Sequence, residues 1–269
     1  MKRAVMIWMS LFGWLLLFKA SRLSAALKDS GNLTSMVYIP EGSFTPFIQA
    51  VSSSQQVEIK GFMMDKYAVT NKQFLAFVKA NPQWARSRVP QLLADEHYLE
   101  QWKQDEQIGD PRIENSPVTN ISWFAASAYA KWAGKRLPTL QEWEYVMRAP
   151  AVNLPKTETM TAYLLNWYGR PTPRLIPSVG STYKNKMGVY DMAGLVWEWV
   201  YDFNSVVKGS DSRSQGTLQK SLFCASGSQN VLNKEDYAGF MRFGFRASLK
   251  ARYCIRNLGF RCAMDAKSP

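Results

Sequence analysis

The cysteines and the single histidine of this sequence, Cys224, Cys254, Cys262 and His97, are the first candidates for transition-metal ligands, and the cysteines could also form a disulfide. Three cysteines are too few for an all-cysteine zinc site or a disulfide-dense scaffold. A single histidine excludes a three-histidine metal site, a two-histidine iron site and a HExxH protease within this chain. His97 stands in a polar stretch, where we expect a solvated loop side chain rather than a ligand. A metal or thiol site in this chain would therefore involve its cysteines.

Helices that could position these groups begin at capping residues. Thr70 and Asn71 both offer an N-cap for the amphipathic stretch NKQFLAFVKANP, and Ser122 precedes a helical pattern that runs to Trp132. Thr139 opens a third helix, TLQEWEY, with Glu142 at the capping-box position. These signals predict three helices.

The rest of the chain indicates short strands and long loops. Runs rich in β-branched and aromatic residues at 36–47 and 55–70 predict paired strands. Residues 83–116 lack periodicity, so we expect a surface insertion with short helical pieces there. We expect a loop at 151–187 and short strands with turns after residue 222. The sequence predicts a single α+β domain with little regular secondary structure.

The amino terminus has the pattern of a targeting signal. Lys2 and Arg3 precede the apolar run AVMIWMSLFGWLLLF at 4–18, which is shorter than the roughly 20 residues that span a bilayer. Small residues follow, so cleavage after Ala25 or Ala26 is expected. We predict a signal peptide at 1–26 and a periplasmic or secreted protein, with an uncleaved membrane anchor as the alternative.

The chain is basic, with a formal net charge of +12. The predicted signal peptide carries four cationic residues and no acid, and residues 206–269 are rich in Lys and Arg. A basic face attracts nucleic acid, anionic lipid or an acidic protein. No nucleic-acid motif is present, so cations at 242–261 favour an acidic protein partner. Alternatively, arginines there bind carboxylates and carbonyl groups within the fold.

Five ordered motifs resemble the formylglycine-generating enzyme family, also called sulfatase-modifying factor domains. They are MVYIPEGSF, DKYAVTNKQF, PVTNISWFAASAYAKWAGKRLPTLQEWEYVMR, GVYDMAGLVWEWVYD and NLGFRCA. The resemblance spans residues 36–264. It implies a C-type-lectin-like core, low in regular secondary structure and rich in loops.

The resemblance also implies a copper(I) site formed by two cysteines after a Gly-Gly-Ser motif. Aligning on SGS places Val231 and Asp236 at those positions, whereas aligning backward from NLGFR places Asn233 and Ala238 there. Copper(I) prefers soft sulfur ligands, and neither alignment supplies one. We therefore expect no bound copper and no formylglycine synthesis.

The resemblance implies that the last cysteine, Cys262, corresponds to one half of a structural disulfide of the family. The position of its partner is occupied here by Ala130. In an oxidising compartment we expect Cys224–Cys262 or Cys254–Cys262 instead. A free buried thiol and a metal or redox role are the alternatives.

Two residues correspond to calcium ligands of the family. At the site of Glu198, Leu195 replaces the asparagine that the family has before the WEW motif. At the other site, the Asp-Gly element that the family has after the position of Asn166 is missing. Calcium takes six to eight oxygen ligands. Glu198 and Asn166 are therefore candidate ligands of incomplete sites.

The family's substrate groove retains three matching residues: Ser228, Trp199 and Arg246. They predict a groove that binds a peptide or protein without redox chemistry. The carboxyl-terminal motifs resemble accessory proteins associated with copper nitrite reductase, so the hypothesis is an accessory factor for a periplasmic metalloenzyme. The alternative is an oxidoreductase acting on sulfur groups of a protein substrate, and carbohydrate recognition ranks last.

Overall fold

Capping side chains start three helices where the sequence predicts them. The computed structural model describes residues 35–46, 56–154, 158–204 and 234–266. Thr70 caps α2 (Asn71–Ala80) and Thr139 caps α4 (Leu140–Met147), both in complete capping boxes. Ser122 caps α3 (Trp123–Trp132) by accepting a hydrogen bond from the Ala125 amide. All three predicted helices are confirmed.

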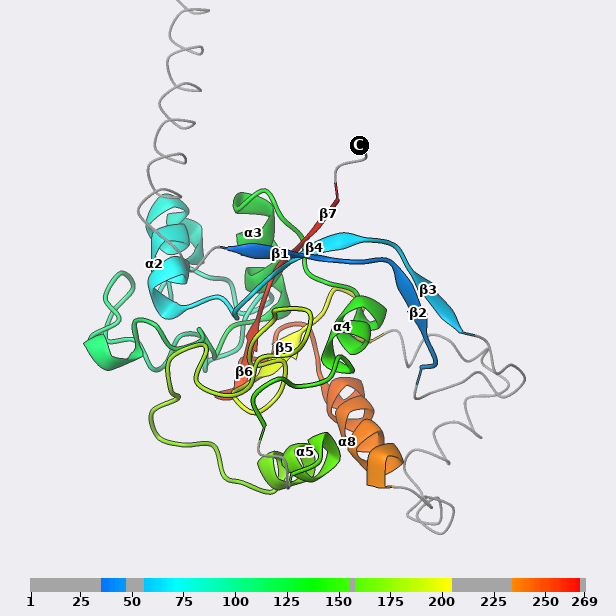
Figure 1. Cartoon of the computed structure of the whole chain (residues 1–269). Helices are drawn as coiled ribbons and strands as arrows, with labels where there is room; N and C mark the ends of the chain where they lie inside the picture. The colour runs from blue at the N-terminus through cyan, green and yellow to red at the C-terminus, as the bar shows by residue number, and fades with distance from the viewer. Residues whose placement is uncertain (1–34, 47–55, 155–157, 205–233, 267–269) are drawn as a thin grey trace, which may run out of the picture. The chain divides into compact units, whose positions relative to one another are not determined.

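The strands are short and form three small groups (Figure 1). An antiparallel sheet has the order β1 (Met36–Ile39), β4 (Phe62–Asp65) and β7 (Ala263–Asp265). β2 (Gly42–Phe44) pairs with β3 (Val57–Ile59), also antiparallel. β5 (Trp197–Trp199) pairs in parallel with β6 (Leu258–Phe260). Paired strands in the first two runs are therefore confirmed.

Two helices differ from the prediction. α5 (Met160–Tyr168) lies in the expected loop at 151–187, and α8 (Lys234–Ser248) lies where short strands and turns were expected. α5 and α8 pack against each other, so tertiary contacts stabilise both. The glycines within α8 and the aromatic residues within α5 weaken the helical signal of each segment.

The segment at 83–116 is only partly a surface insertion. It holds the expected short helical pieces, η1 (Pro82–Trp84) and η2 (Pro111–Ile113). However, Tyr98, Leu99 and Trp102 are almost fully buried and belong to the hydrophobic core. These side chains anchor the segment to the rest of the domain.

The core is strongly aromatic around α2 and α3. Phe74 of α2 stacks on Tyr129 of α3 with 5.8 Å between ring centroids, and Phe260 of β6 meets both rings edge-on. The stretch Met36–Pro269 forms one compact unit. The predicted signal peptide at 1–26 lies outside the described residues. Within the described part of the chain, no helix has the length and apolarity needed to cross a bilayer.

Candidate functional site

The two described residues of the predicted groove are buried in the core. Trp199 has no exposed surface, and its indole N–H donates to the Ile121 carbonyl oxygen at 2.9 Å. Arg246 is 2% exposed. Ser228 lies outside the described residues. The prediction that Trp199 and Arg246 contact a partner is therefore wrong, because the fold uses both for internal packing.

Arg246 belongs to an ion-pair cluster formed by α4 and α8. Glu144 of α4 accepts two hydrogen bonds from Arg242, at 3.1 and 3.0 Å, and one from Arg246 at 3.1 Å. The Arg246 guanidinium also lies over the Trp143 ring, 4.4 Å from its centroid. Burial opposes the charge on Glu144, but the two arginines outweigh it and lower the pKa of this carboxyl below its ordinary value.

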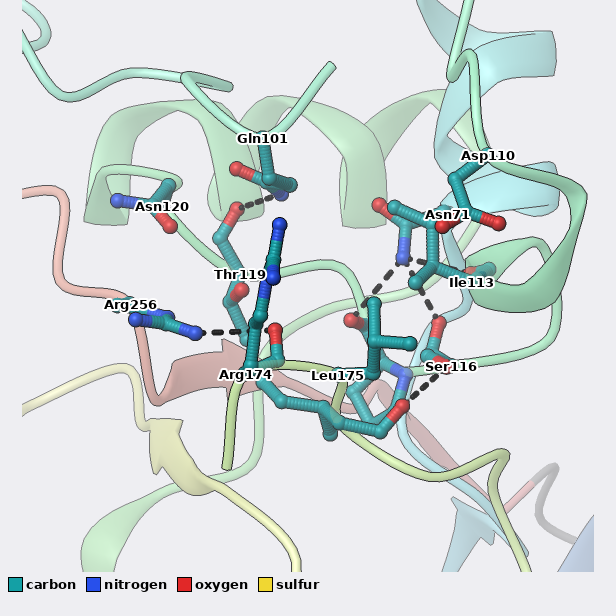
Figure 2. Close-up of a pocket in the computed structure, with 12 residues that line it drawn as sticks. Asn71, Gln101, Asp110, Ile113, Ser116, Thr119, Asn120, Arg174, Leu175 and Arg256 are labelled. Carbon is teal, nitrogen blue, oxygen red and sulfur yellow. Dashed lines mark hydrogen bonds between the residues drawn. The ribbon is translucent and has the colours of Figure 1, made fainter. Parts of the chain in front are cut away.

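A pocket of about 360 Å³ lies elsewhere, beside the start of α2 (Figure 2). It had no counterpart among the sequence predictions. Its lining comes from four separated stretches of the chain: Asn71, residues 101–120, residues 174–176 and Arg256. Because the lining residues are scattered along the sequence, no local motif could indicate this pocket.

Hydrogen bonds hold the walls of the pocket in place. The Asn71 side-chain amide donates to the carbonyl oxygens of Ile113, Ser116 and Pro117, and its oxygen accepts the Trp102 indole N–H at 2.8 Å. The Ser116 hydroxyl donates to the Ile176 carbonyl at 2.6 Å. The pocket is thus formed before any ligand enters, as most small-molecule sites are.

A family model described as Sulfatase-modifying factor enzyme 1-like domain matches residues 22–266. The chain belongs to the formylglycine-generating enzyme family. The formylglycine-generating enzyme of Streptomyces coelicolor is 30% identical over 257 residues, covering 78% of this chain and 80% of that enzyme. The inactive C-alpha-formylglycine-generating enzyme 2 of Mus musculus is 26% identical over 277 residues, covering 87% of each.

The chain is also similar to part of a longer protein and to a solved structure. The serine/threonine-protein kinase pkn1 of Chlamydia caviae is 26% identical over 252 residues, which is 90% of this chain but only 40% of the kinase. The structure of PvdO from Pseudomonas aeruginosa aligns with a TM-score of 0.50 and 22% identity, over 86% of this chain and 94% of PvdO. The α+β fold with a C-type-lectin-like core is thereby confirmed.

The thiols described in this family member do not fit a copper(I) site. Cys254 and Cys262 are both buried and are not joined to each other, so the predicted Cys254–Cys262 disulfide is wrong. The two cysteines lie in different places of the fold, because the Cys254 amide donates to Asp95, whereas the Cys262 amide donates to Asp65. Cys224 itself lies outside the described residues.

Both thiols are held in the protonated form. Burial, followed by the neighbouring carboxylate, raises the pKa of Cys254 and of Cys262 well above the ordinary thiol value. Copper(I) binds the thiolate form, so these groups are unsuited to it. Of the aligned copper positions, Asp236 and Ala238 fall within α8, and Val231 and Asn233 lie outside the described residues.

The predicted calcium ligands are bound to arginines. Both oxygens of Glu198 accept hydrogen bonds from Arg261, at 2.8 and 2.7 Å, and one also accepts the Trp143 indole N–H at 2.8 Å. Asn166 is exposed on α5, and its oxygen accepts a hydrogen bond from Arg170. In the described ranges, no three His, Cys, Asp or Glu side chains are grouped to hold a metal. In this structure both candidate calcium ligands, Glu198 and Asn166, thus have arginine partners instead.

His97 is exposed, as expected for a loop histidine. Its Nδ1 lies 2.8 Å from Glu100, and this hydrogen bond, with the charge of Glu100, raises the pKa of the imidazole. No other potential ligand joins the pair into a metal site within the described residues.

Proposed function

We propose that this family member is exported and does not make formylglycine. It acts instead by binding a protein partner, as an accessory factor in the maturation of a periplasmic metalloenzyme. The observation that carries the proposal is the state of Cys254 and Cys262, which are buried, protonated and placed beside different carboxylates. The oxidase reaction of the family requires a pair of copper-binding thiolates.

The sequence between Cys224 and Cys254 contains no cysteine. α8 occupies much of that interval, and its arginines form the ion-pair cluster with Glu144. A relative of comparable length is named an inactive enzyme, which supports a family role without this oxidation. The same burial argues against the alternative of a sulfur-directed oxidoreductase based on these two thiols.

Surface charge after α8 supports an acidic partner. Arg242, Arg246 and Arg261 are buried, so these three cations bind within the fold and do not steer a partner. Lys250 and Arg252 are exposed, and neither forms an ion pair with another described residue. Exposed unpaired cations mainly accelerate association with an acidic surface.

Peptide oxidation tests the negative half of the proposal. Purified protein, supplied with copper and oxygen, is incubated with a cysteine-containing peptide, with the Streptomyces coelicolor enzyme as positive control. We expect the peptide mass to stay unchanged in mass spectrometry. Appearance of the aldehyde product would overturn this half of the proposal.

Charge reversal tests the positive half. The tagged protein carrying Lys250→Glu and Arg252→Glu is compared with a matched control carrying Lys79→Glu and Lys131→Glu, which are exposed elsewhere. We expect the unchanged protein and the control to retain one acidic envelope protein after crosslinking, and the first variant to lose it. Equal retention by both variants contradicts the proposed surface.

A further inference from the structure

The pocket beside α2 contains two buried hydrogen-bond acceptors without partners. The side-chain oxygen of Asn120 and that of Gln101 both lie on the pocket lining, and neither receives a hydrogen bond. Asn120 is only 1% exposed. Buried polar groups in native proteins nearly always have a partner. Two such orphans in one pocket therefore indicate a ligand that supplies hydrogen-bond donors.

The orientation of both amides is set by their surroundings. The Asn120 nitrogen donates to the Glu100 carboxylate at 3.3 Å and to the Cys254 carbonyl at 3.4 Å. The Gln101 nitrogen donates to the Thr119 carbonyl at 2.9 Å. Because these partners are acceptors, exchanging nitrogen and oxygen in either amide would place two acceptors against each other. The groups left over for a ligand are thus oxygens.

The backbone under these oxygens is locked. Asn120 has φ +51° and Leu99 has φ +49°, and the Leu99 amide donates to the Asn120 carbonyl at 2.8 Å. The Asn120 amide donates to the Ile255 carbonyl at 3.1 Å. Asparagine adopts left-handed backbone more readily than most residues, whereas a leucine such as Leu99 is held there only by its surroundings. Such strained positions are common at binding sites.

The pocket also has a cationic and an apolar part. Arg174 and Arg256 are exposed lining residues, and within the described ranges neither is paired with a carboxylate. Figure 2 shows Gln101 and Asn120 on one side of the pocket and Ile113 on the other, with Leu175 between them. A ligand would thus meet oxygens, guanidinium groups and an aliphatic wall.

From this arrangement we infer that the pocket binds a small zwitterion with an aliphatic side chain, of the size and chemistry of a free leucine. Its ammonium group donates to the oxygens of Asn120 and Gln101, its carboxylate faces Arg174 and Arg256, and its side chain lies against Ile113 and Leu175. The pocket volume of about 360 Å³ falls within the range of small-molecule sites. The lining residues of this pocket do not include Lys250 or Arg252, the two cations of the partner surface proposed above.

Calorimetric titration of the full chain tests the inference with three matched compounds. Leucine carries both charged groups, 4-methylpentanoate lacks the ammonium group, and 3-methylbutylamine lacks the carboxylate. We expect leucine to bind at least about tenfold more tightly than either analogue, because hydrogen bonds to charged groups are the stronger ones. Absence of heat with leucine, or equal binding of 4-methylpentanoate, overturns the inference.

Two variants locate the binding. Arg174→Ala changes an exposed side chain, so the protein stays folded, and Gln101→Met removes the orphan oxygen while keeping the length of the side chain. Each should weaken leucine binding by about tenfold, the usual effect of losing one charge-assisted contact. Lys79→Ala, an exposed cation outside the pocket lining, is the control. Unchanged affinity for leucine in Arg174→Ala rules out the position assigned to the ligand's carboxylate. This result does not depend on whether the protein binds the acidic partner proposed above.

Discussion

Arg242 and Arg246 both direct their guanidinium groups at the carboxylate of Glu144, and all three side chains are about 95% buried or more. Two cations therefore share one anion. The Tyr168 hydroxyl group, 3.4 Å from Arg242, adds a neutral contact. The Nε of Arg246 has no hydrogen-bond partner, so this side chain depends on Glu144 and on the Trp143 ring for its stabilisation.

Replacing Glu144 by glutamine should strongly destabilise the protein. The substitution leaves two buried guanidinium groups without a counter-charge, a loss of about 3–5 kcal/mol in the free energy of unfolding. Urea unfolding followed by tryptophan fluorescence measures it. Glu106→Gln, at an exposed position, should change the free energy by less than about 0.5 kcal/mol. An equal effect of both substitutions would contradict the assigned role of Glu144.

The two described cysteines should be unreactive in the folded protein. Burial raises the pKa of each thiol and keeps reagents away. In a Cys224→Ser background, which isolates the described pair, a thiol-specific disulfide reagent should label neither cysteine under native conditions and both after denaturation. Rapid labelling of the folded protein would show that a thiol is accessible, and would revive the oxidoreductase alternative.

At the scale of elements, α8 is attached through both charge and aromatic contacts. Its Phe245 stacks on Trp197 of β5, with 4.4 Å between the ring centroids, and Trp197 also stacks on Tyr168 of α5. The Glu144 cluster lies on the same helix. Loss of the ion pairs should therefore loosen α8 first and weaken its contacts with α5 and β5.

Acid should reveal the contribution of Glu144 to the attachment of α8. The folded-state pKa of Glu144 lies below its unfolded value, so its stabilisation is complete above the unfolded pKa and is lost as pH falls through the folded pKa. Between about pH 6 and pH 3, the difference in unfolding free energy between the wild type and Glu144→Gln should shrink. Burial raises the pKa of Asp65, so its contribution to stability has the opposite dependence on pH. Asp65 is present in both proteins, so its contribution cancels in the difference. A constant difference over this range would refute the prediction.

Local signals determine which of these elements the sequence could predict. The side chains of Thr70, Ser122 and Thr139 accept hydrogen bonds from amides three residues ahead, so the starts of three helices are encoded within one turn. The contacts that stabilise α8 reach Glu144, 98 residues before Arg242. The pocket likewise combines Asn71 with Arg256. Only folding brings such residues together, so neither could be derived from spacing.

At the scale of the molecule, side chains that bind backbone carbonyls replace the missing regular structure. Arg261 has no exposed surface. It pairs with Glu198 of β5 and donates to the carbonyl oxygens of Asp65, Lys66 and Tyr190. One guanidinium group thus joins the end of β4, the segment before β5 and β5 itself. The five donors of arginine in a fixed plane make this possible.

Arg261→Lys should therefore damage the whole domain although it preserves the charge. An ammonium group has three donors and cannot reach three carbonyls and both oxygens of Glu198 at once. Several buried acceptors would be left unpaired, at about 1–3 kcal/mol each, and the melting temperature should fall by far more than in the exposed control Arg252→Lys.

Replacing Arg261 and Glu198 together by methionine removes the unpaired charge and should cost less than the sum of the single replacements. If the losses of unfolding free energy in the two single replacements simply add up in the double replacement, Arg261 and Glu198 stabilise the fold independently. The effect of Arg261 would then come from its contacts with backbone carbonyls alone.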